Sequence, residues 1–167
     1  MENKKTKVNV EEQFVKYVKK YFNFLITEYE SKLIKIKEDV FGTYIYYQNN
    51  EIGISINFTP GGIWVEIHEL KNNSIPLISG ETGVTYGLNY IIQAKNPSHE
   101  EYSPDGKELI KDHHLVEKVV VYLANNLKKY ATDILQGNSP VFKAANQLRL
   151  KKIKSIDNKF LKDLKTK

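Results

Sequence analysis

Histidines are the side chains in this sequence best suited to acid–base or metal chemistry, and the chain has four of them. His113 and His114 are adjacent, and Glu117 follows His113 by about one helical turn. Adjacent helix positions point about 100° apart, so both imidazoles cannot easily reach one ion. His113 and Glu117 share a face, but two ligands do not make a zinc site. We therefore predict no metal site here and interpret the pair as part of a solvated first helical turn.

Glu66 and His68 form the one pair whose spacing suits proton transfer. They lie two residues apart in a strand-like run, so their side chains point the same way, and Asn57 lies in the preceding run. A carboxylate beside an imidazole can do acid–base work, but the pair also fits an ordinary polar sheet face. No histidine, His99 included, has a serine or carboxylate at a spacing that indicates a triad. We predict no catalytic residue and no enzymatic activity.

Composition removes several other chemistries. The chain has no cysteine, which excludes disulfides, thiolate zinc sites and cysteine nucleophiles. Glycines at 61–62 and between 80 and 87 do not have the spacings of phosphate-binding loops, so we interpret both regions as turns. We predict no cofactor.

The strand-like runs that carry these polar residues alternate with a period of two. Apolar residues occupy every second position of residues 52–58 and again of residues 63–67, and turn-forming residues separate the runs at 60–62. A tyrosine-rich run, residues 43–48, precedes them. This pattern predicts an antiparallel β-meander of three to four strands.

Helical periodicity flanks the meander. Apolar residues recur at spacings of three and four in residues 10–30 and again between Asp112 and Gly137, and Pro140 begins a further helix. The segment 71–111 is rich in proline and glycine, and we expect at least one short element in it. The fold class predicted is α+β: an N-terminal helix, the meander, and two C-terminal helices packed on one sheet face.

Charge divides the chain into two parts. The net charge is +5, but residues 1–138 carry −2 and residues 139–167 carry +7. We predict one α+β domain over residues 1–150 and a basic C-terminal tail over residues 151–167. Neither the lysine-rich residues 1–10 nor the longest apolar run, residues 119–124, is apolar and long enough for a signal peptide or a membrane span. We therefore expect no contact with a membrane and a cytoplasmic location.

One face of the predicted sheet is rich in aromatic residues. If Ile54 and Ile56 face the core, the alternation places Trp64 on the opposite face, together with His68 and close to Tyr46. An aromatic side chain on a polar sheet face can anchor a partner. We predict that Tyr46, Trp64 and His68 form a partner-binding surface. The alternative is that the 71–111 segment or another helix covers Trp64.

Two runs resemble known proteins. Residues 127–137, LKKYATDILQG, followed by Ser139 to Phe142, and the earlier run FLITEY at 24–29, resemble small uncharacterised bacterial α+β proteins. Some of those are similar to immunity proteins of bacterial toxin systems. The shared positions are of core type, so the resemblance transfers no functional residue. Inhibitors of nuclease toxins tend to be acidic, whereas this tail is basic.

Three functions remain open at this point. The first is a non-enzymatic protein-binding module, of which an immunity-like protein is one form, with another protein as its partner. The second is a nucleic-acid-associated protein that uses the basic tail, which is not favoured because the body of the chain is slightly negative. The third is a small-ligand binder or enzyme with a pocket under the 71–111 segment.

Overall fold

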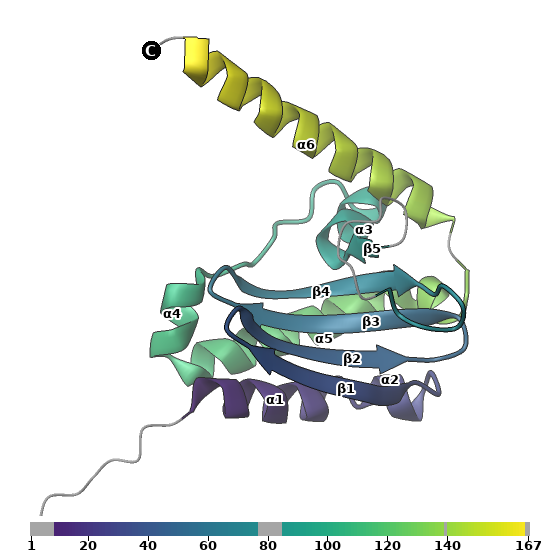
Figure 1. Cartoon of the computed structure of the whole chain (residues 1–167). Coiled ribbons are helices and arrows are strands. Elements are labelled where there is room, and N and C mark those ends of the chain that lie inside the picture. The colour runs from purple at the N-terminus through teal and green to yellow at the C-terminus, as the bar shows by residue number, and fades with distance from the viewer. Residues whose placement is uncertain (1–8, 77–84, 139, 166–167) are drawn as a thin grey trace, which may run out of the picture.

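The computed structural model describes residues 9–76, 85–138 and 140–165, with side chains up to residue 155 (Figure 1). The elements, in chain order, are α1 (Val10–Tyr21), α2 (Phe24–Thr27), β1 (Lys32–Asp39), β2 (Gly42–Gln48), β3 (Ile52–Thr59), β4 (Gly62–Glu69), β5 (Thr85–Gly87), α3 (Leu88–Lys95), α4 (Gly106–Lys111), α5 (His113–Leu135) and α6 (Val141–Lys165). The predicted α+β class is confirmed. The sheet has five strands rather than three to four, in the order β1-β2-β3-β4-β5, and every neighbouring pair is antiparallel.

The helix ends follow from local chemistry. Asn9 Oδ1 accepts a hydrogen bond from the backbone N–H of Glu11, which caps α1. Asp112 Oδ1 accepts one from His114 N and caps α5 in the same way. Gly137 has a φ of 88°, a left-handed conformation that lets the chain leave α5 without strain. The first helix predicted over residues 10–30 is two helices in the structure, because α1 ends at Tyr21 and α2 forms a separate short turn.

The core lies between one face of the sheet and the helices α1 and α5, which run behind the sheet in Figure 1. Ile54 and Ile56 on β3 are fully buried, as predicted, and Phe58 packs on Phe14 of α1 with ring centroids 5.3 Å apart. The long apolar stripe of α5 is buried along most of its length. Two helices therefore cover this face, which we call the core face.

The last helix packs elsewhere. α6 contacts mainly α3 and β5, and Phe142 stacks on Tyr86 of β5 with centroids 4.1 Å apart. This position differs from the expected packing of both C-terminal helices on one sheet face, because α1 and α5 already occupy the core face. The predicted tail continues α6 as far as Lys165, and the helix projects away from the body (Figure 1). Residues 166 and 167 lie outside the described part.

The segment 71–111 contains β5, α3 and α4, so the expectation of at least one element there is confirmed. Residues 71–76 fold back over the sheet, where Gln48 Nε2 donates to Asn73 O at 2.8 Å. A Cβ at position 53 would lie 2.3 Å from Ile75 Cγ1, so only glycine lets Ile75 pack this closely on β3. Among the described helices, none has the length and apolar character that crossing a bilayer requires.

Candidate functional site

The sheet face opposite the core face, here called the outer face, carries polar and aromatic side chains. The strand register places Ser55 opposite both Tyr46 and Glu66, and Gly53 opposite His68. Tyr46, Trp64, Glu66 and His68 therefore share this face, as the alternation in the sequence predicts. In Figure 1, the front of β1 to β4 has none of the described helices over it.

A chain of hydrogen bonds crosses the outer face. Asn57 Nδ2 donates to Glu66 Oε2 at 3.1 Å, and Ser55 Oγ donates to the same oxygen at 3.4 Å. His68 Nε2 lies 2.9 Å from Ser55 Oγ, and His68 Nδ1 lies 3.0 Å from Thr85 Oγ1 on β5. Because the Ser55 proton goes to Glu66, Nε2 of His68 is the donor and Nδ1 accepts from Thr85. Each donor and acceptor named in this hydrogen-bonded network therefore has a partner.

Burial shifts the pKa values of the two titratable groups in this hydrogen-bonded network, in each case toward the uncharged form. Burial lowers the pKa of His68 to about 4, so the imidazole is neutral at neutral pH. Burial also raises the pKa of Glu66, and the hydrogen bonds from Asn57 and Ser55 and the charge of Arg149 partly offset that rise. Directed donors therefore hold the Glu66 carboxyl group in place and favour its charged form.

This arrangement does not make a nucleophilic site. In a triad the imidazole bridges the hydroxyl and the carboxylate, whereas here the Ser55 hydroxyl lies between His68 and Glu66. Ser55 is only 1% exposed, so a substrate carbon has no path to its oxygen. The network instead positions the Glu66 carboxyl group.

A pocket opens beside Glu66, at the edge of β4. β5 is short, and its three residues pair only with Glu66, Ile67 and His68. The chain turns into α3 directly after Gly87, so no described strand pairs with the first half of β4 on this side. The space is a cavity of about 430 Å³ between β4, α3 and residues 99–103, which we call the β4-edge pocket. The third function left open by the sequence places a pocket under the segment 71–111, and lining residues between 85 and 103 belong to that segment.

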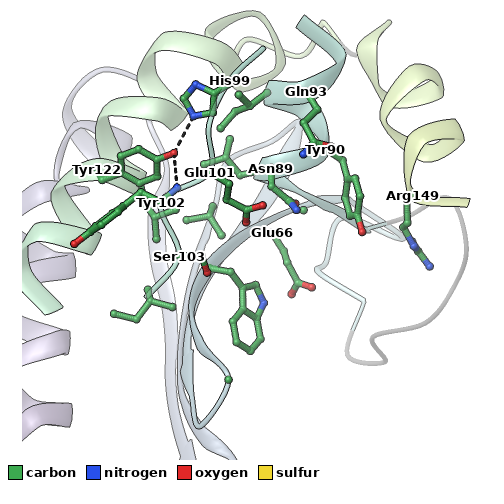
Figure 2. Close-up of a pocket in the computed structure, with 18 of the residues that line it drawn as sticks. Glu66, Asn89, Tyr90, Gln93, His99, Glu101, Tyr102, Ser103, Tyr122 and Arg149 are labelled. Atoms are coloured by element: carbon green, nitrogen blue, oxygen red, sulfur yellow. Dashed lines mark hydrogen bonds between the residues drawn. The ribbon is translucent and has the colours of Figure 1, made fainter. Parts of the chain in front are cut away.

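The far wall of the pocket is fixed by Tyr122 of α5. The Tyr122 hydroxyl donates to Glu100 O at 3.2 Å, and it accepts from the Tyr102 backbone N–H at 3.2 Å. His99 Nε2 lies 2.8 Å from the same oxygen, and the rings of His99 and Tyr122 stack at 22° (Figure 2). This one hydroxyl, on a half-buried tyrosine, thus holds residues 99–102 against α5.

Charged and aromatic side chains line the pocket together. The carboxyl and guanidinium groups of its lining belong to Glu66 of β4, Glu101 of the far wall and Arg149 of α6. Arg149 Nη1 donates to Thr85 O at 3.3 Å, which ties α6 to β5. Its aromatic lining includes Trp64, Tyr90 and Tyr102, and its apolar lining includes Leu88, Ile92 and Leu123.

The three residues predicted to form a partner-binding surface share the outer face but have different surroundings in the structure. Trp64 is 37% exposed and lines the β4-edge pocket, whereas Tyr46 is half-buried and lies outside it. His68 is 5% exposed and does not line the pocket, but its Nδ1 lies 3.0 Å from Oγ1 of Thr85, which does. Glu101, Tyr90 and Arg149 were missed, since no local pattern marks residues brought together from three distant segments.

The adjacent histidines pack against each other at the start of α5. The rings of His113 and His114 lie 4.1 Å apart, and Glu117 accepts hydrogen bonds from Tyr21 and Lys20 of α1. Within residues 9–76, 85–138 and 140–155, no group of three His, Asp or Glu side chains is placed to hold a metal ion.

A second feature of the outer face is the β1–β2 hairpin tip. Val40 is 90% exposed and Phe41 is 70% exposed. Phe41 lines a shallow depression with Tyr44, Trp64 and Glu66, so Trp64 contributes to this surface as well as to the β4-edge pocket.

Comparison of the chain with protein families, with curated proteins and with solved structures gives no match.

Proposed function

We propose that this protein is a non-enzymatic binding module and that its ligand site is the β4-edge pocket. The single observation that carries the proposal is a cavity of about 430 Å³ in which polar groups converge between apolar and aromatic walls. Sites for small molecules usually combine such walls with a few placed polar groups. The hydrogen-bonded positions of Glu66 and residues 99–102 also support it, because a preformed site loses less entropy on binding.

The single tryptophan gives a direct test. Trp64 contributes the one indole N–H resonance of the protein, and it lines the pocket. Titration of the labelled full chain with a library of small aromatic fragments should shift this resonance in a saturable way. In the variant Ser103→Phe, whose new ring fills the pocket mouth, the shift should be lost. Ser98→Phe is the matched control, since Ser98 is exposed and outside the pocket.

Two results would contradict the proposal. One is the absence of any saturable shift across the library in the wild-type chain. The other is a shift that persists unchanged in Ser103→Phe, which would place fragment binding elsewhere.

A protein partner is the second candidate, and the exposed Val40 and Phe41 favour it. Aromatic and apolar residues on an accessible surface are typical anchors of protein interfaces. The contact surface would combine Phe41, Trp64 and the neighbouring Tyr46. A partner that binds the wild-type chain and the control Ile26→Ser, but not Phe41→Ser, would support this surface. Equal binding by all three would exclude it.

Three finer assignments remain part of the proposal. A cytoplasmic location is supported by the lack of cysteine, which fits a reducing compartment. An immunity-like role is supported only by the resemblance of residues 24–29 and 127–142. A nucleic-acid role is supported by the exposed lysines of α6, namely Lys151, Lys152 and Lys154, and predicts binding that weakens steeply with salt.

A further inference from the structure

We infer that the β4-edge pocket selects an organic cation, a single ammonium group carried on a compact apolar or aromatic body. This inference rests on the proposed function and names the class of ligand. Three features of the lining carry it: the balance of charge, the way Glu66 is held, and the aromatic faces beside it.

The charge balance favours one positive charge. Among the lining residues other than His99, Glu66 and Glu101 are acidic and Arg149 is basic, so their formal charges sum to −1. In Figure 2, Glu66, Glu101 and Asn89 extend into the same part of the pocket, whereas Arg149 lies to one side, on α6. Arg149 is also already engaged by its hydrogen bond to Thr85 O. A monocation would neutralise the set.

Glu66 is prepared to accept a charged donor. Asn57 and Ser55 both donate to Oε2, and a hydrogen bond from the Trp64 side chain adds to them, so the carboxyl group is held in place where it lines the pocket. Burial disfavours its charge and raises its pKa, and a ligand ammonium would supply the missing compensation. Charge-assisted hydrogen bonds of this kind are about twice as strong as neutral ones.

Aromatic rings line the same cavity. Trp64 and Tyr102 come from β4 and the far wall, and cations are attracted to the faces of such rings. The ring of Tyr90 on α3 also lines the pocket, and Lys152 Nζ of α6 already lies 5.8 Å from its centroid. Leu88 and Ile92 supply apolar contact for the body of the ligand. A small inorganic cation has no apolar body to contact Leu88 and Ile92, so the lining favours an organic cation.

Three probes of matched shape test the assignment. Phenethylammonium, phenethyl alcohol and phenylpropanoate share one ring and differ in charge. Each is titrated into the full chain at pH 7 while the Trp64 indole resonance is followed. The ammonium should bind at least about tenfold more tightly than the alcohol, and the carboxylate more weakly still, because an ionic hydrogen bond adds that much.

Variants locate the charge that is recognised. Glu66→Gln should reduce the affinity for phenethylammonium about tenfold or more and leave that for the alcohol unchanged. Glu101→Gln should have a smaller effect, because its side chain is exposed. Glu100→Gln is the matched control, since Glu100 neighbours Glu101 but does not line the pocket.

The outcomes separate the inference from the proposed function. Equal or tighter binding of the alcohol or the carboxylate at Trp64 overturns the cation assignment and leaves the pocket as a ligand site. An ammonium affinity that is unchanged in Glu66→Gln also overturns it. If none of the three probes shifts the resonance, the inference is wrong, and the fragment library decides separately whether the pocket binds anything.

Discussion

The core face and the outer face of the sheet are built from the same strands with the same alternation, and both are closely packed at their centres. On the core face Ile54 is fully buried beneath α1 and α5, and on the outer face Ser55 is 1% exposed. The difference lies in what covers them. Helices cover the core face, whereas neighbouring side chains and the 71–76 turn cover the outer face.

The comparison separates stability from recognition. Burial of apolar side chains is the dominant favourable term in folding, and it is not directional. The core face therefore contributes most of the free energy of folding. The outer face instead holds Asn57, Ser55 and Glu66 by directed hydrogen bonds, which fix a carboxyl group at the pocket. Substitutions on the two faces should therefore differ in how much they change the free energy of unfolding, and in how that change depends on pH.

The largest effect is expected on the core face. Ile54→Ala should lower the free energy of unfolding by about 2–5 kcal/mol, because it leaves a cavity beneath two helices. Val40→Ala, at a position 90% exposed, is the control and should change it by less than about 0.5 kcal/mol. Urea unfolding followed by circular dichroism measures both. Equal costs would show that the two positions do not differ in packing.

The outer face should make stability depend on pH through His68. Its pKa is about 4 in the folded protein and 6.5 when unperturbed, so between these values the unfolded chain binds the extra proton. Stability should therefore fall by about 3 kcal/mol as pH drops from 6.5 to 4. His68→Gln should remove this part of the dependence, measured by urea unfolding at several pH values.

Glu66 acts in the opposite sense over part of this range. Its raised pKa means that the folded protein keeps its proton to a higher pH than the unfolded chain does, so its contribution falls as pH rises through that pKa. Because Glu66→Gln removes the carboxyl group and leaves His68 in place, the pH dependence of stability in this variant isolates the contribution of His68. If the pH dependence of His68→Gln matches that of the wild type, the buried neutral imidazole is not its source.

A smaller loss of stability is expected when the hydrogen-bonded chain is cut. Ser55→Ala removes the partner of both His68 Nε2 and Glu66 Oε2, and should cost about 1–3 kcal/mol of unfolding free energy. Ser98→Ala, at an exposed position, should cost almost nothing. Thermal denaturation compares the two, and a neutral Ser55→Ala would mean that the network does not position Glu66.

The smallest effect should come from the end of α6, which lies on neither face. Leu150 and Ile153 are about two-fifths exposed, at 40% and 41%. Truncation after Lys154 should leave the midpoint of thermal unfolding within a few degrees, a loss of under about 1 kcal/mol. Loss of cooperative unfolding on truncation would show instead that the tail is structural.

The sequence by itself determined the elements and the two faces. A period of two places Ile54 and Ile56 on one side and Trp64, Glu66 and His68 on the other, because successive side chains of a strand alternate. Helical periodicity and the caps at Asn9 and Asp112 likewise predict α1 and α5. The three-residue β5 was missed because it is too short to show alternation.

Only the tertiary structure decided what each face does. His68 was predicted at a binding surface, but it is 5% exposed in the structure, where it contacts Thr85 of β5, and no local pattern in the sequence indicates that burial. The β4-edge pocket exists because β5 stops early and α3, the far wall and α6 close around the free edge of β4. Glu66, Glu101 and Arg149 meet there through contacts between distant segments, which depend on how the whole chain packs.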